Sequence, residues 1–85
     1  MIKEYVKTAT VKAIQVTPDN HDEVKEFAYP QEIGFGLFHS IDTLEGEMFF
    51  YDNDYLIKNT TGECYVCAKD IFEKTYKEIK WKTLV

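Results

Sequence analysis

Three turn signals in the second half of the chain constrain the fold more than any other feature. Glu45-Gly46, Asp52-Asn53-Asp54 and Asn59-Thr60-Thr61-Gly62 separate short runs that are rich in aromatic and apolar residues. Glycine and asparagine tolerate the positive φ that tight hairpins require. Strands joined by short hairpins form an antiparallel meander. We therefore expect strands over 36–44, 48–51, 55–58 and 63–67.

The segments on either side of the meander predict one more strand and two helices. Apolar residues alternate over 10–16, which favours a strand ending before Pro18. Asn20 and Glu23 have the spacing of a capping box, so a helix is expected over 20–28.

Asp70 and Glu73 repeat the capping-box spacing and predict a helix over 70–78. A last strand over 79–85 or a frayed tail would follow. The expected fold class is α+β, a small antiparallel β-meander sheet with two short helices packed on one face.

The length of 85 residues limits the chain to a single domain, 1–85. Six Tyr, six Phe and one Trp supply enough apolar surface for a small core without disulfide bonds. There is no apolar run long enough to span a bilayer, and residues 1–5 lack the apolar stretch of a signal peptide. A cytoplasmic protein without membrane contact is expected.

The acidic residues are concentrated in the middle of the chain. Ten of the fifteen acids lie between Asp19 and Asp54, where Lys25 is the single basic residue. Phosphate binding needs clustered basic residues, so nucleic acid is not an expected direct partner. The acidic segment is either a solvated face that maintains solubility or a surface for a basic protein partner.

No residue pattern predicts catalysis, a cofactor or a metal. Cys64 and Cys67 match a redox spacing, but the expected helix starts too late, and residues three apart on a strand point to opposite faces. A zinc site would need further ligands, and His21 and His39 show no paired spacing. His39, within an apolar strand, is interpreted as structural. A non-enzymatic protein is therefore expected.

Tyrosines lie close to the acidic residues in the sequence of the meander. They are typical either of the boundary of a core or of a binding surface. The residues predicted to bind a partner are Asp42, Glu45, Glu47, Asp52, Asp54, Tyr51 and Tyr55.

Two stretches resemble a family of small phage and prophage proteins named for a Pro-Gly-Asp-Tyr-Gly motif. The first is 13–17 with Asn20 and 23–27, and the second comprises 43–48, 54–58, 62–65, Cys67 and 70–76. The similarity covers most of residues 10–79. At the motif itself this chain has Asp52-Asn53-Asp54-Tyr55, and Asn53 can adopt the left-handed conformation of the missing glycine.

The resemblance implies a phage accessory protein acting in a bacterial cytoplasm, and it implies no enzymatic activity. Together with the acidic segment, the resemblance favours a protein that binds a host or defence protein. A narrower hypothesis is that the acidic surface inhibits this partner. The alternatives are a protein that binds or sequesters a small molecule such as a nucleotide signal, with a pocket created by homo-oligomerisation, and a minor virion or assembly component.

Overall fold

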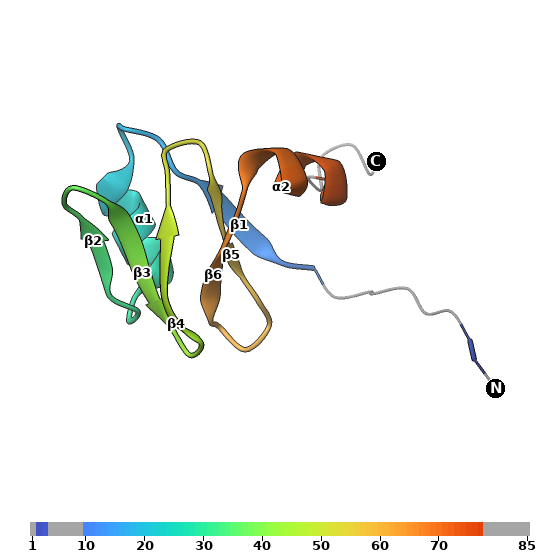
Figure 1. The fold of residues 1–85 in the computed structure, drawn as a ribbon. Helices are drawn as coiled ribbons and strands as arrows, with labels where there is room; N and C mark the ends of the chain where they lie inside the picture. Colours follow the sequence, from blue (N-terminus) through green and yellow to red (C-terminus); the bar gives the residue numbers. More distant parts are fainter. Residues whose placement is uncertain (1, 4–9, 78–85) are drawn as a thin grey trace, which may run out of the picture.

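The fold contains two antiparallel sheets and two short helices (Figure 1). It is seen in a computed structural model that describes residues 2–3 and 10–77. The elements, in chain order, are β1 (Lys12–Gln15), α1 (His21–Ala28), β2 (Ile33–Phe35), β3 (His39–Thr43), β4 (Gly46–Phe50), β5 (Tyr55–Lys58), β6 (Cys64–Cys67) and α2 (Lys69–Thr75).

The strands divide into two three-stranded sheets. The first has the order β1-β5-β6 and the second has the order β2-β3-β4, with all neighbours antiparallel. The expected α+β class is confirmed, and so are the hairpins between β3 and β4 and between β5 and β6. The strands form two sheets where one meander sheet was expected, because β4 and β5, on either side of the turn at 52–54, pair with different partners. The three-residue strand β2 was not predicted, because Gly34 and Gly36 interrupt the apolar pattern there. The strand expected over 79–85 lies outside the described residues.

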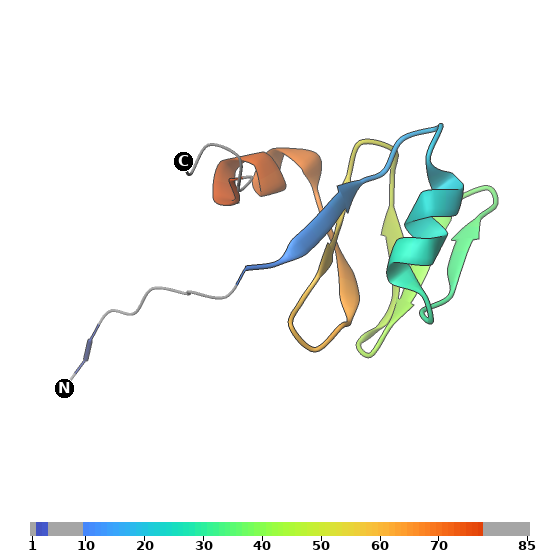
Figure 2. The ribbon, with the colours of Figure 1, turned by 180° about the vertical axis from the view of Figure 1, so that it is seen from behind.

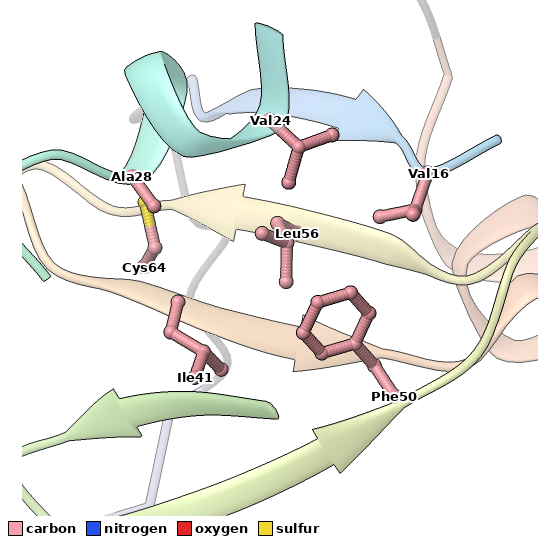
Figure 3. Packing of buried hydrophobic residues seen from close by; sticks show 7 residues of the cluster. All are labelled: Val16, Val24, Ala28, Ile41, Phe50, Leu56 and Cys64. Carbon is pink, nitrogen blue, oxygen red and sulfur yellow. The ribbon is translucent and has the colours of Figure 1, made fainter. Parts of the chain in front are cut away.

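Helix α1 lies across one side of the strands (Figure 2), and one apolar cluster lies between it and the inner faces of both sheets (Figure 3). Helix α1 contributes Val24 and Ala28, which are one helical turn apart and therefore share a face. Leu56 of β5 meets side chains from the other sheet here, so both sheets depend on the same buried surface. The fully buried members are Val16, Val24, Ala28, Ile41, Phe50, Leu56 and Cys64.

Helix α2 lies on the opposite face of the β1-β5-β6 sheet from α1. Tyr55 alternates with Leu56 along β5 and so points away from the shared core. The Phe72 ring of α2 stacks on Tyr55 with 3.8 Å between centroids, and Tyr76 stacks on Phe72 in turn. No residue of Lys69–Thr75 is itself buried. The two helices therefore cover different faces of this sheet, whereas packing on one face was expected; alternation along β5 gives each face its own apolar side chain, Leu56 toward α1 and Tyr55 toward α2.

The two expected capping boxes are wrong, although both helices form near the predicted positions. Asn20 is the N-cap of α1, but its side chain turns back to accept a hydrogen bond from Thr17 N and to donate one to Gln15 O, both at 2.8 Å. Helix α2 begins at Lys69, so Asp70 lies inside it. The amide of Lys69 donates instead to Oδ1 of Asp54, which lies in the turn between β4 and β5.

Candidate functional site

Two histidines and an aspartate meet where α1, β3 and the β4–β5 turn come together. Nε2 of His21 and Nε2 of His39 each lie 3.1 Å from the same Oδ1 of Asp52. One candidate ligand atom from each residue lies within 4.8 Å of the other two. His21 is the first residue of α1, His39 is the first residue of β3, and Asp52 lies in the β4–β5 turn, two residues after the end of β4.

Aromatic packing holds the two imidazole rings in place. The His21 ring is parallel to that of Phe35, with 3.9 Å between centroids and an interplanar angle of 5°. His39 makes edge contacts with both His21 and Phe35, and it is paired in register with Phe50 on β4. Because rings wedged in this way have few alternative rotamers, their Nε2 atoms are held toward Asp52.

The turn that carries Asp52 is fixed by its neighbour. Asn53 has a φ of 82°, so the expectation that it would adopt the left-handed conformation is confirmed. Its amide donates to Val16 O at 2.6 Å, and its carbonyl accepts from Gln15 Nε2 at 3.1 Å. These bonds attach the turn to the last residue of β1 and to the residue after it, and they set the position of the Asp52 carboxylate.

Electrostatics in the cluster favour the ionised carboxylate. The hydrogen bond from His21 lowers the pKa of Asp52 below its ordinary value, and the bond from His39 adds to this despite opposing desolvation. A carboxylate can only accept, so each imidazole, in its neutral form, carries its proton on Nε2 in this arrangement. His39 Nδ1 is buried and finds no hydrogen-bond partner among the residues that the structure describes.

Sequence reasoning did not bring these three residues together. In the sequence, His21 and His39 have no paired spacing, and the charge pattern places Asp52 on an acidic binding surface. The cluster depends on the packing of α1 against β2, which the local pattern does not encode. The available signal was weak: each residue sits at the boundary of an element, where side chains of different segments converge.

The outer face of the β2-β3-β4 sheet carries acidic and aromatic side chains side by side. Asp42 and Glu47 face each other in register across β3 and β4, and both are exposed. On the same face, farther from the turn that joins β3 and β4, the next pair is Ser40 and Phe49. The outer face therefore has an acidic end, near the β3–β4 turn, and an aromatic end.

The aromatic end consists of Phe38, Phe49 and Tyr51, which line a shallow hollow with the edge of Phe50. Phe38, Phe49 and Tyr51 are 68%, 57% and 70% exposed, and the Phe38 and Phe49 rings meet edge to face at 6.2 Å. The sequence contained a signal for this cluster. Phe49 and Phe50 are consecutive on one strand, so one of them has to face away from the core.

The residues predicted to bind a partner do not form one surface. Asp42, Glu45, Glu47 and Tyr51 are exposed on the β3–β4 hairpin or directly after it. Asp52 is engaged by the two histidines. Asp54 accepts hydrogen bonds from the amides of Tyr51 and Lys69, and Tyr55 stacks beneath α2.

The two cysteines are free and lie on opposite faces of β6, in agreement with their spacing along a strand. Cys64 is part of the shared core and Cys67 is half-buried. Burial raises the pKa of both thiols, which opposes formation of a reactive thiolate.

Comparisons of the chain with protein-family models, with curated proteins and with solved structures give no match. Within the described residues, no helix has the length and apolar character needed to cross a membrane. The chain is a small α+β protein, and its described residues form two antiparallel three-stranded sheets and two short helices.

Proposed function

We propose that this is a non-enzymatic phage accessory protein that binds a host or defence protein through the outer face of its β2-β3-β4 sheet. The observation that carries the proposal is the exposed aromatic cluster of Phe38, Phe49 and Tyr51 beside the acidic pair Asp42 and Glu47. The phage context derives from the sequence resemblance, and the binding face derives from this arrangement of side chains.

The aromatic end suits the centre of a protein interface. Exposed aromatic side chains that gather in one place are costly in water, and burying them against a partner recovers that free energy. Tyrosine and other aromatic residues also supply much of the binding energy at interfaces when they fill a partner's pocket. Leu37, which is almost fully exposed next to Phe38, extends the apolar area.

The acidic end points to a basic partner. Like charges directly opposite each other on antiparallel strands repel, so Asp42 and Glu47 weaken the hairpin in the free protein. Lysine or arginine from a partner would relieve this repulsion and would steer the encounter. A protein surface that holds nucleic-acid phosphates is rich in lysine and arginine. An acidic face therefore fits an inhibitor that occupies such a surface in place of the nucleic acid.

The test is capture of partners from host lysate by the tagged protein at low and at high salt, with mass spectrometry as the readout. We expect one stoichiometric protein that is lost as the salt concentration rises. The double variant Asp42→Lys/Glu47→Lys should lose it, and so should Phe49→Ser.

A matched control is Glu23→Lys/Glu26→Lys, which makes the same change of charge on the exposed side of α1. This control should still capture the partner. Equal capture by the control and the hairpin variants would refute the assigned face. Absence of any protein partner would favour the small-molecule or virion alternatives.

A further inference from the structure

We propose that His21, His39 and Asp52 form a binding site for a divalent first-row transition-metal ion, with Zn²⁺ as the best match to the ligand set. This inference is independent of the proposed binding face, because the three residues lie at the inner side of the sheet and in the adjoining turn. It rests on the geometry of the cluster, on its rigidity and on the chemistry of its donor atoms.

Two of the three donor-atom separations are close to those of a metal coordination sphere, and the third is within 4.8 Å. Zinc binds imidazole nitrogen and carboxylate oxygen at about 2.0–2.2 Å, so two ligands of a tetrahedral site lie about 3.3 Å apart. Asp52 Oδ1 lies 3.1 Å from each histidine Nε2, close to that separation. An ion could therefore replace the two bridging protons with small adjustments of side chains that already point at one another.

The three ligands come from separate elements that are held rigidly. Phe35 clamps the His21 ring, Phe50 and Phe35 flank His39, and the bonds of Asn53 fix the turn that carries Asp52. A site that is formed before the ion arrives avoids the cost of ordering its ligands. Side-chain exposures of 28% for His21, 19% for His39 and 34% for Asp52 leave a route for the ion from solvent.

Metal binding would break no hydrogen bond at Nδ1 of His39. Metal binding through Nε2 moves the ring proton to Nδ1, so an atom that was an acceptor without a partner within the described residues becomes a donor without one. Two neutral imidazoles and one carboxylate are also a recognised donor set for Zn²⁺ and Fe²⁺. Three protein ligands leave a coordination position for water or for a donor atom of a bound molecule.

The competing explanation is a hydrogen-bonded network that only attaches the β4–β5 turn to α1 and β3. That network would form without metal, and its stability would not respond to metal ions. The two explanations therefore differ in stoichiometric binding, in thermal stability and in the chemical shifts of the histidine nitrogens.

The experiment titrates chelator-treated full-length protein with Zn²⁺ and Co²⁺ by calorimetry and visible absorption. A Cys67→Ser background removes the partly exposed thiol as an adventitious ligand. We expect one ion per chain, a Co²⁺ spectrum of a low-symmetry nitrogen and oxygen site, and a higher melting temperature with Zn²⁺. Nitrogen-15 spectra should show both Nε2 atoms shifting on metal addition.

Variants separate the ligands from the surrounding acidic residues. Asp52→Asn and His21→Asn should each weaken binding at least tenfold, whereas Asp42→Asn, which removes the same charge from the outer face, should leave the affinity within twofold. Circular dichroism checks that each variant folds. The nitrogen-15 shifts are measured with both histidines in place, so that result does not depend on the folding of the ligand variants. A dissociation constant weaker than about 100 µM for both ions, or equal affinity in Asp52→Asn and Asp42→Asn, would overturn the proposal.

Discussion

At the scale of single residues, Gln31 joins the two sheets. Its Nε2 donates to Asp42 O on β3 and to Cys64 O on β6, both at 2.9 Å, and its Oε1 accepts from Cys64 N at 2.6 Å. The side-chain amide thus pairs with the peptide groups of Cys64 as a neighbouring strand would. One residue between α1 and β2 supplies a link that the strand pairing itself does not make.

Replacing Gln31 by Ala should lower the free energy of unfolding by about 2–3 kcal/mol, because the partly buried peptide groups of Cys64 lose their partners. Chemical denaturation measures this change. Gln15→Ala is the control, since its side chain makes one exposed hydrogen bond to the backbone, and it should cost less than about 1 kcal/mol. Equal effects of the two substitutions would contradict the bridging role.

Asn53 is the other residue whose conformation is decisive. At its φ of 82°, a β-branched side chain is strained, so Asn53→Val should destabilise the protein by about 1–2 kcal/mol. Asn53→Gly should stay within about 0.5 kcal/mol of the parent, because glycine adopts positive φ freely. The pair of melting curves tests this, and similar losses in both variants would show that the Asn side chain matters more than its backbone.

At the scale of elements, α2 depends on one small group of polar and aromatic contacts. A helix of this length is marginal in isolation, so its stability comes from packing. Phe72 stacks on Tyr55, while Glu73 accepts hydrogen bonds from Tyr55 Oη at 3.2 Å and from Lys69 Nζ at 2.9 Å. The protonation states of Tyr55 and Glu73 therefore bear on how firmly α2 is attached.

The attachment of α2 should weaken at both extremes of pH. Burial, and then the bond to Glu73, raises the pKa of Tyr55 above 10.0, so its contribution is complete below pH 10 and is lost as the pH rises through the folded pKa. The bond from Lys69 lowers the pKa of Glu73 below 4.5, so that contribution is present above this pH and is lost as the pH falls through the folded pKa.

Glu73→Gln tests the coupling directly. Carbon-13 NMR of the Tyr55 ring should show its pKa falling toward 10.0 in this variant while staying above it, because burial is the larger cause of the increase. An unchanged Tyr55 pKa would mean that the carboxylate does not act on the phenol.

At the scale of the whole molecule, the shared core predicts one cooperative unfolding transition. Leu56 contacts the cluster that also holds Ile41 and Phe50 of the other sheet. Leu56→Ala should therefore cost about 2–5 kcal/mol and should accelerate amide exchange in β3 as well as in β5. Exchange confined to the β1-β5-β6 sheet would show that the two sheets unfold separately.

The sequence predicted those parts of this architecture that depend on near neighbours. The strand over 55–58, the left-handed Asn53 and the opposed faces of Cys64 and Cys67 follow from turn chemistry and alternation, and all three are present. These features need no knowledge of distant segments.

Two kinds of feature could not be predicted in this way: the choice between competing local partners, and contacts between distant segments. The side chain of Asn20 bonds back to residues 15 and 17, where the expected capping box required it to point forward. The contact between His21, His39 and Asp52 requires the packed positions of three elements, which no spacing rule provides. Division of the strands into two sheets likewise depends on how α1 covers the core.

The pairing of β1 with β5 has a consequence for synthesis of the chain. Gln15 lies opposite Tyr55, so β1 emerges from the ribosome well before its hydrogen-bonding partner exists. At translation rates of about 5–20 residues per second, the wait is on the order of 2–8 seconds. During this interval the nascent strand has unpaired peptide groups, and the polar residues Lys12 and Gln15 on either side of Ala13 and Ile14 limit the apolar surface it offers to chaperones.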